Sequence, residues 1–543
     1  MISKTKQRQY TAIHAGRRAL SLAIAGALAI GLQAPVRGQG FPAALELSSL
    51  DGANGFWLNA EAADDQAGFA VSGLGDVNGD GVDDLIIGAP YAGGYAGRSY
   101  VVFGSAAGLP QPVELSALNG SNGFAINGES ADDRSGHSVS TAGDLNGDGV
   151  VDLVIGAPYA DAPGADAGRS YVVFGTADVF AQPLELSSLD GENGFVINGE
   201  AAGDRLGSSV GAAGDLNRDG IDDLIIGADG SDAGGTDAGR SYVLFGTRGG
   251  FPATLSLSSL TGTNGFALDG AIGGEGAGAA VGAAGDINGD GINDVVIGAN
   301  LASPNGDASG RGYVVFGTTS AFPNPLVLSS LSGADGFAIN GEAEFDFFGQ
   351  SVSAAGDVSG DGLDDVVISA RLADANGRSS GRAYVVFGSR NAFASPLEAS
   401  GLAGTSGFIV NGEAEGDSAG RSVSAAGDVN NDGFGDFVIG ALFADPNGDN
   451  SGRGYVVFGS ATPPANPLEL ASLNGQTGFV LNGEAAGDRA GFSVSDAGDI
   501  NGDGVDDLLI GANEAESAGD YAGRAYVVYG RSDNLFADSF EGD

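Results

Sequence analysis

The chain has 543 residues, 98 of them glycine, with no cysteine and with 70 acidic against 23 basic side chains, for a formal net charge of −47. This excess of negative charge repels nucleic acid and anionic lipid, and a chain without cysteine cannot rely on disulfides. Beyond residue 38 there is one histidine, His137, and no lysine. Histidine triads, ordinary zinc sites and lysine Schiff bases therefore find little support, and His137 is expected to be a tolerated rim residue.

Residues 1–38 have the pattern of a secretory signal peptide. Six of the 23 basic residues lie here, around an apolar run from Ala19 to Leu32 that is too short to span a bilayer. The pair Arg17-Arg18 leaves a twin-arginine signal as the alternative. We expect bacterial export to the medium or the cell surface, and no transmembrane segment once the signal is removed.

The rest of the chain is a repeat. The motif GDVNGDGVDDLIIGA at residues 75–89 recurs seven times, at intervals of 68 residues once and 71 residues five times. Similarity at a fixed period indicates a solenoid or a propeller. One period contains four short apolar stretches bounded by glycine, aspartate and asparagine, in the second copy at 136–144, 153–157, 168–175 and 193–200. Four short strands per repeat are typical of a propeller blade.

The two ends of the repeat array favour a closed ring over a solenoid. The last copy stops after its third strand at residues 523–530, and an extra fourth-strand sequence, NGFWLNAEA, precedes the first copy at 54–62. Pairing the orphan strand with the incomplete blade would remove two sheet edges, whereas a solenoid would need polar caps. We therefore predict an all-β, seven-bladed β-propeller of four-stranded blades over residues 39–530, closed by a strand at 55–61 and followed by a tail at 531–543.

The repeat resembles a known family. SVSTAGDLNGDG and DLVIGAP, both within residues 138–158, are similar to the FG-GAP repeats of integrin α-subunit propellers and their bacterial relatives, and the resemblance extends over residues 41–530. It implies a seven-bladed propeller with calcium loops between the first and second strands of the blades. The phenylalanine of the family's FG element occurs only at Phe348.

The acidic loop itself has the donors of a calcium site. In the first copy, positions 1, 3, 5 and 9 are Asp, Asn, Asp and Asp, and position 7 can offer a backbone carbonyl. Calcium takes six to eight oxygen ligands in a loose shell, and the glycine at position 6 permits a sharp turn. No helices flank the loop and no glutamate stands at position 12, so it differs from an EF-hand. We expect up to seven structural Ca²⁺ ions, each bracing a hairpin with an extracellular type of affinity.

The predicted ligands are positions 1, 3, 5, 7 and 9 of each loop. They are Asp76, Asn78, Asp80, Val82 and Asp84; Asp144, Asn146, Asp148, Val150 and Asp152; Asp215, Asn217, Asp219, Ile221 and Asp223; Asp286, Asn288, Asp290, Ile292 and Asp294; Asp357, Ser359, Asp361, Leu363 and Asp365; Asp428, Asn430, Asp432, Phe434 and Asp436; Asp499, Asn501, Asp503, Val505 and Asp507. Position 8 varies and is not expected to be a ligand. Arg218 makes the third loop the weakest candidate.

Seven equivalent arginines begin the third strands in the sequence Gly-Arg-x-Tyr, and a repeated position of this kind indicates a structural clamp between blades. The face opposite the calcium loops carries the more variable loops, which favours it for ligand contacts. The fifth repeat departs most from the others there, and Phe345, Phe347, Arg371 and Arg378 form the candidate ligand-binding cluster, because aromatic and arginine side chains often anchor interfaces.

The sequence thus predicts a secreted or surface-attached, calcium-binding adhesion or ligand-binding module, monomeric and not an enzyme, with a protein or glycan partner. No catalytic residue is assigned. Two alternatives remain at this point: a carboxylate-based enzyme acting on polysaccharide, and a purely structural envelope protein.

Overall fold

The computed structural model describes residues 40–532. The chain separates into two units, Met1–Gln39 and Gly40–Asp543. The predicted signal peptide and all but the first two residues of the predicted tail therefore lie outside the described residues. Within them, no helix is long and apolar enough to cross a membrane.

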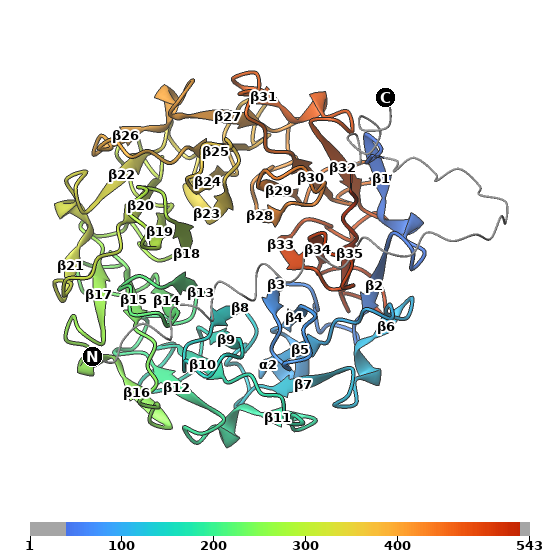
Figure 1. Cartoon of the computed structure of the whole chain (residues 1–543), viewed down its shortest axis with the longest axis horizontal. Helices are drawn as coiled ribbons and strands as arrows, with labels where there is room; N and C mark the ends of the chain where they lie inside the picture. The colour runs from blue at the N-terminus through green and yellow to red at the C-terminus, as the bar shows by residue number, and fades with distance from the viewer. Residues whose placement is uncertain (1–39, 533–543) are drawn as a thin grey trace, which may run out of the picture. The chain divides into compact units, whose positions relative to one another are not determined.

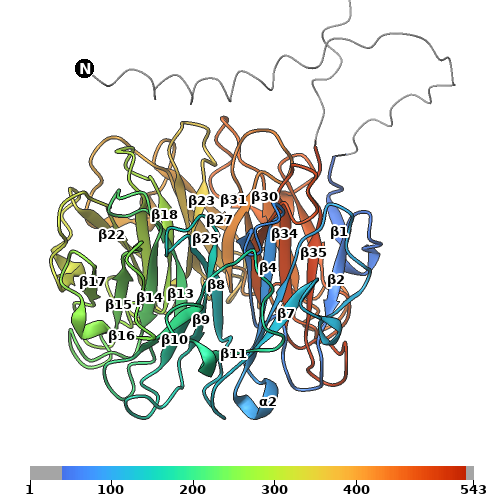
Figure 2. The same cartoon turned by 60° about the horizontal axis from the view of Figure 1, so that its bottom comes forward.

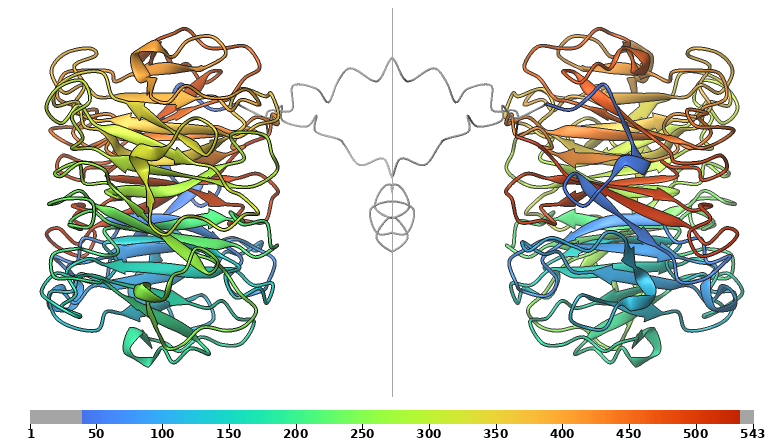
Figure 3. Two further views of the ribbon diagram at one scale, coloured as in Figure 1. Left: turned by 90° about the vertical axis from the view of Figure 1, so that its left-hand side faces the viewer. Right: turned by 90° about the vertical axis from the view of Figure 1, so that its right-hand side faces the viewer.

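Residues 40–532 form seven five-stranded sheets that follow one another around a ring (Figure 1). The predicted all-β, seven-bladed propeller is confirmed, whereas each sheet has five strands and not the predicted four. The blades succeed each other in chain order, as the colours show from both sides of the ring in Figure 3. In each blade the strands run antiparallel from the innermost to the fourth.

The strands of blades 1 to 4 have the following bounds. Blade 1 has β3 (Ala70–Gly75), β4 (Asp84–Ala89), β5 (Arg98–Val102), β7 (Gly123–Asn127) and β11 (Leu184–Glu185). Blade 2 has β8 (Ser138–Gly143), β9 (Asp152–Ala157), β10 (Arg169–Val173), β12 (Gly194–Asn198) and β16 (Thr254–Ser256). Blade 3 has β13 (Ser209–Gly214), β14 (Asp223–Ala228), β15 (Arg240–Leu244), β17 (Gly265–Asp269) and β21 (Leu326–Val327). Blade 4 has β18 (Ala280–Gly285), β19 (Asp294–Ala299), β20 (Arg311–Val315), β22 (Gly336–Asn340) and β26 (Leu397–Glu398).

The remaining blades repeat this plan. Blade 5 has β23 (Phe348–Gly356), β24 (Asp365–Ala370), β25 (Arg382–Val386), β27 (Gly407–Asn411) and β31 (Leu468–Glu469). Blade 6 has β28 (Val423–Gly427), β29 (Asp436–Ala441), β30 (Arg453–Val457), β32 (Gly478–Asn482) and β1 (Ala44–Glu46). Blade 7 has β33 (Ser493–Gly498), β34 (Asp507–Ala512), β35 (Arg524–Val528), β2 (Gly55–Asn59) and β6 (Val113–Glu114). Within residues 40–532 the helical segments are α2 (Ala92–Tyr95) and seven 3₁₀ turns, η1 (Leu47–Ser49), η2 (Leu115–Ala117), η3 (Leu186–Ser188), η4 (Leu257–Ser259), η5 (Leu328–Ser330), η6 (Ala399–Gly401) and η7 (Leu470–Ser472).

Continuous apolar runs form the middle of each blade. The second strands, such as β4 with the sequence DLIIGA, are buried at every residue. In the third strands only the leading arginine is partly exposed. A strand covered on both faces has no polar side to alternate with, which explains these runs. The hydrophobic clusters accordingly join residues of neighbouring blades, and burial of apolar surface between blades holds the ring together.

The ring closes through the first strands of the described chain. β2 pairs antiparallel with β35, with Trp57 opposite Tyr526, and completes blade 7 as predicted. β1 adds a second closure, because it pairs in parallel with β32 of blade 6. Figure 1 shows this meeting of blue and red strands. The closing segment therefore begins earlier than the predicted strand, at Ala44.

In six blades the fifth strand comes from the long connection between the third and fourth strands of the next repeat, and in blade 6 it is β1, which precedes the closing strand β2. In this connection, two or three residues pair in parallel with the outer strand of the preceding blade, as Leu184 does with Ile126. A phenylalanine just upstream stacks on that strand, with the Phe124 and Phe180 ring centroids 4.2 Å apart. Equivalent stacked pairs join Phe195 to Phe251, Phe266 to Phe322, Phe337 to Phe393 and Phe479 to Phe41. The connection thus holds neighbouring blades together through strand pairing and aromatic stacking.

Candidate metal loops and the opposite face

Each predicted calcium loop links the first and second strands of a blade. In blade 1 the Asp76 carboxylate accepts hydrogen bonds from the backbone N–H groups of Gly79, Asp80 and Gly81, at 2.6, 3.0 and 2.7 Å. The chain therefore wraps around the side chain at position 1. Gly81 has φ +88°, a conformation that side chains disfavour, with open space where a Cβ would stand.

The same wrapping recurs in the other six loops. In each, the position 1 carboxylate accepts the N–H of the position 6 glycine at 2.8–2.9 Å. The side chains at positions 1, 3 and 5 are thereby held on one short turn. The predicted ligands of each loop thus lie on one turn without converging on a common point, and the seven loops belong to seven separate blades.

The position 9 aspartate anchors the loop from below. Asp84 is fully buried and accepts N–H hydrogen bonds from Val77 at 3.0 Å and from Gly104 at 2.9 Å. Gly104 follows the third strand, so this carboxylate ties the loop to the rest of its blade. Burial raises the pKa of Asp84 to about 8, and the charges of Asp80 and Asp76 add to the rise against its two amide bonds.

Position 8, which the sequence left without a role, joins neighbouring loops. The Asp83 carboxylate of blade 1 accepts the N–H of Asp499, position 1 of the loop in blade 7, at 2.8 Å. Equivalent bonds run from Asp144 to Asp222, Asp215 to Asn293, Asp286 to Asp364 and Asp428 to Asp506. Where position 8 is Val151 or Gly435, its own N–H donates to the neighbouring position 1 carbonyl. The seven loops are therefore linked around the ring.

The donor set of the loops suits a hard cation. Carboxylate, amide and carbonyl oxygens are the ligands of calcium, whereas magnesium requires a stricter octahedron. Within residues 40–532 no three Asp, Glu or His side chains converge into a ready-made metal cluster, so a bound ion would have to draw the oxygens of a loop together. In the third loop, the Asn217 amide oxygen is buried without a hydrogen-bond partner, an acceptor that a cation would satisfy.

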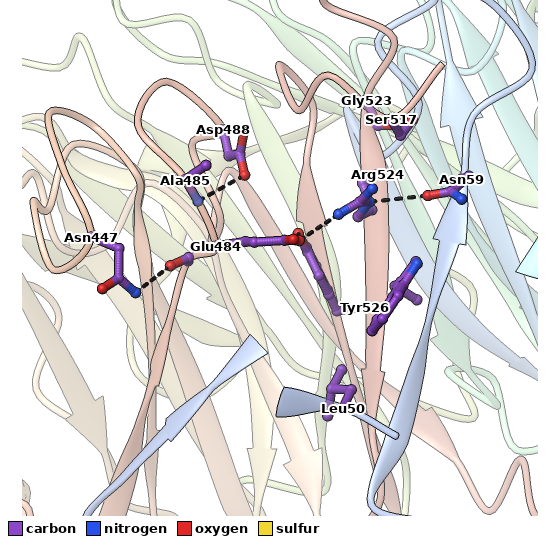
Figure 4. A network of polar contacts seen from close by, with 12 residues as sticks. Leu50, Asn59, Asn447, Glu484, Ala485, Asp488, Ser517, Gly523, Arg524 and Tyr526 are labelled. Carbon is purple, nitrogen blue, oxygen red and sulfur yellow. Dashed lines mark hydrogen bonds and ion pairs between the residues drawn. The ribbon is translucent and has the colours of Figure 1, made fainter. Parts of the chain in front are cut away.

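Six of the seven repeated arginines form ion-pair clamps between blades, as expected. In Figure 4, Arg524 of β35 ion-pairs with Glu484, which lies in the linker from blade 6, and its Nε donates to Asn59 of the closing strand at 3.1 Å. Tyr526 donates its hydroxyl to the same glutamate at 3.0 Å. The six such pairs are Arg98–Glu61, Arg169–Glu129, Arg240–Glu200, Arg382–Glu342, Arg453–Glu413 and Arg524–Glu484. Blade 4 differs.

The face opposite the calcium loops carries an aromatic cluster around Arg134, formed by Tyr91, Tyr95 and Tyr159. The guanidinium carbon lies 5.3, 6.0 and 4.5 Å from the three ring centroids. Tyr91 precedes the α2 turn and Tyr95 ends it, and α2 lies at the lower edge of the ring in Figure 2; Tyr95 is 48% exposed. The three loops that supply this Arg134 cluster come from different parts of the sequence, and sequence reasoning missed it.

His137 packs beside this cluster. Its ring lies 5.1 Å from that of Phe69 and 6.1 Å from that of Tyr159. Burial lowers the pKa of His137 to about 4, and the positive charges of Arg421 and Arg134 lower it further. The imidazole is therefore neutral and weakly basic at pH 7, and its visible role is in packing.

The predicted ligand-binding cluster of the fifth repeat lies on this same face. Phe345 is 52% exposed, Arg378 is exposed, and Phe347 is half-buried. Arg371 is half-buried and donates from Nε to Gln350 at 3.2 Å. The backbone N–H of Phe345 donates a hydrogen bond to the backbone carbonyl of Asp307, in a loop of blade 4, at 2.8 Å. The structure thus places the two phenylalanines and the two arginines on loops of the same face.

These features define the described chain as a seven-bladed β-propeller with an acidic loop in every blade. The FG-GAP repeat family matches it seven times, at residues 67–102, 135–173, 206–244, 277–315, 348–386, 419–457 and 492–528. The chain belongs to the FG-GAP repeat proteins, and its propeller is of the integrin α type.

Curated relatives share part of the chain. It is 34% identical over 221 residues to phosphatidylinositol-glycan-specific phospholipase D of Rattus norvegicus, covering 39% of this chain and 24% of that protein. It is 30% identical over 237 residues to integrin alpha-PS2 of Drosophila melanogaster, covering 43% and 15%, and 33% identical over 193 residues to integrin alpha-PS5, covering 35% and 17%. The matched parts thus make up a quarter or less of these relatives.

Proposed function

We propose that this protein is an exported ligand-binding propeller whose calcium ions have a structural role. The observation that carries the proposal is the Arg134 cluster: three tyrosines and an arginine gathered on one face, with Tyr95 exposed. Tyrosine and arginine are enriched among residues that dominate binding energy. The repeated acidic loops and arginines, by contrast, have structural roles within and between the blades.

The comparisons support a binding module without naming its ligand. Integrin α subunits and a phospholipase D share this repeat, and the match to the phospholipase covers 24% of its length. Proteins with such different names can share one repeat if the repeat supplies a scaffold that carries different binding sites, because function belongs to sites and not to the fold. We infer an extracellular protein or glycan as the partner.

Calcium would brace the platform on which the ligand binds. In an EF-hand sensor, calcium changes the angle between two helices. The loops of this propeller connect adjacent strands and are not flanked by helices, so calcium is not expected to act as a conformational switch of that kind. Affinity of the extracellular type, with Kd of roughly 10⁻⁴–10⁻³ M, fits this role. Export through the predicted signal at 1–38 would place the chain where calcium is abundant.

The test is a glycan and protein array probed with and without calcium, followed by variants. Arg134→Ala is expected to weaken binding of the partner found by at least about tenfold, because it removes the centre of the cluster. Arg205→Ala is the matched control: it occupies the same repeat position in the next blade, where it faces Asp229 at 3.7 Å. Binding should survive the control change.

Two other outcomes would redirect the proposal. Equal loss in both variants, or no loss in either, would remove the Arg134 cluster as the binding surface. A Phe345→Ala/Arg371→Ala double variant that loses binding would assign the ligand to the fifth blade instead. Turnover of an arrayed polysaccharide would favour the enzyme alternative.

A further inference from the structure

Blade 4 lacks the carboxylate that the other six arginine clamps contain. At the repeat position of Glu200, blade 4 has Ala271. Among residues 40–532, Arg311 is the only one of the seven clamp arginines without an acidic oxygen within 4.0 Å of its nitrogens. Its Nε donates to Asn340 at 2.9 Å, and one terminal nitrogen contacts the Tyr313 hydroxyl at 3.4 Å.

The neighbouring acid does not take over the missing pair. Glu275 is 2% exposed and turns its oxygens to other donors, accepting the Ala271 N–H at 2.5 Å and the Tyr313 hydroxyl at 3.3 Å. It replaces only the tyrosine bond of sister blades, in which the glutamate of the clamp accepts the hydroxyl. The guanidinium of Arg311 remains short of one carboxylate.

A pocket opens at this position. Its volume is about 190 Å³, and its lining includes Arg311, Glu275, Ile272, Leu301 and Pro304. Ile272 and Leu301 are 61% and 45% exposed, unusual values for large aliphatic side chains of this chain. The pocket therefore combines the incompletely paired guanidinium of Arg311 with an apolar surface formed by Ile272 and Leu301.

We propose that this pocket binds a carboxylate attached to a small apolar group. The carboxylate would take the place of the absent glutamate and receive charge-assisted hydrogen bonds from Arg311, whose planar fork fits a carboxylate. The apolar group would cover Ile272 and Leu301. The volume is below the usual 300–1,000 Å³ of drug-sized sites, so the occupant is a short-chain acid or the last residue of a peptide chain.

The site is separate from the Arg134 cluster and does not depend on the proposed function. It also explains why the position that is glutamate in the clamps of six blades is Ala271 in the clamp of blade 4. A glutamate there would fill the pocket with the chain's own carboxylate.

Calorimetric titration of the whole protein with isovalerate tests the proposal, with isovaleramide as the uncharged match and an acetylated glycyl-leucine dipeptide as the chain-end match. Isovalerate or the dipeptide should bind saturably and the amide at least about tenfold more weakly, since charged hydrogen bonds exceed neutral ones. The tighter of the two acids identifies the source of the carboxylate.

Two variants locate the binding. Arg311→Gln should weaken it by about tenfold or more. Ala271→Glu should abolish it while leaving the fold intact, because it installs the clamp of the sister blades; its melting temperature should be no lower than that of the wild type. Absence of binding by both acids, equal binding of the amide, or unchanged binding in Ala271→Glu would each overturn the proposal.

Discussion

Chelation of calcium is expected to lower the melting temperature by about 5–12 °C relative to protein in about 2 mM calcium. An ion that binds only the folded state contributes RT ln(1 + [L]/Kd), or roughly 0.6–1.8 kcal/mol per loop for Kd between about 10⁻³ and 10⁻⁴ M. Seven loops give roughly 5–13 kcal/mol. With about 2.1 cal/mol/K per residue for unfolding, this difference corresponds to the stated shift.

Differential scanning calorimetry in excess EGTA measures this effect. Magnesium restored in place of calcium serves as the control, and it should recover little of the loss because its octahedron fits the loops poorly. A melting curve that is identical with and without EGTA would contradict a structural role for calcium.

Opening the ring closure is expected to have the next largest effect. Phe56→Ala removes a fully buried side chain from β2, the strand that completes blade 7. A phenylalanine-to-alanine change in a core costs about 3–5 kcal/mol, which lowers the melting temperature by about 3–5 °C for a domain of this size. Because β2 has no covalent link to β35, the lost packing should also free this strand locally.

Phe124→Ala is the matched control, because Phe124 occupies the same repeat position in β7 and is equally buried. Hydrogen exchange should show faster exchange in β2 and β35 for Phe56→Ala than for Phe124→Ala. Equal protection of β2 in both variants would mean that this strand does not hold the ring closed.

The architecture could be predicted because every blade repeats it. The orphan strand at the start, with Phe56 and Trp57, needs a partner, and only the incomplete last blade offers one. The fifth strands escaped prediction for a physical reason. Leu184–Glu185 and its counterparts are two or three residues long, too short to show an alternating pattern, and their partners belong to the preceding repeat.

The position of the acidic loops between the first and second strands could be predicted from the sequence, and calcium binding by their side chains stays a prediction. Position 8 was assigned no role. The residue at position 8 differs among the loops, for example Asp83, Val151 and Gly435, and this variation suggested that the position has no role. The structure shows instead that a side chain or a backbone amide can make the link to the neighbouring loop. Likewise, Tyr91, Tyr95 and Tyr159 stand in loops that the sequence cannot bring together, although Ala-Pro-Tyr after the second strand, at Tyr91 and Tyr159, occurs only in the first two blades.

Direct counting of bound calcium tests the central claim, that one ion braces each loop of the ring. After the metal is removed with EGTA and the chelator is dialysed away, equilibrium dialysis against about 20 mM calcium, well above the expected Kd, should give close to seven ions per chain. An Asp144→Asn/Asp148→Asn double variant should bind one ion fewer while the other loops stay loaded. Absence of saturable binding, or an unchanged count in the double variant, would contradict the account.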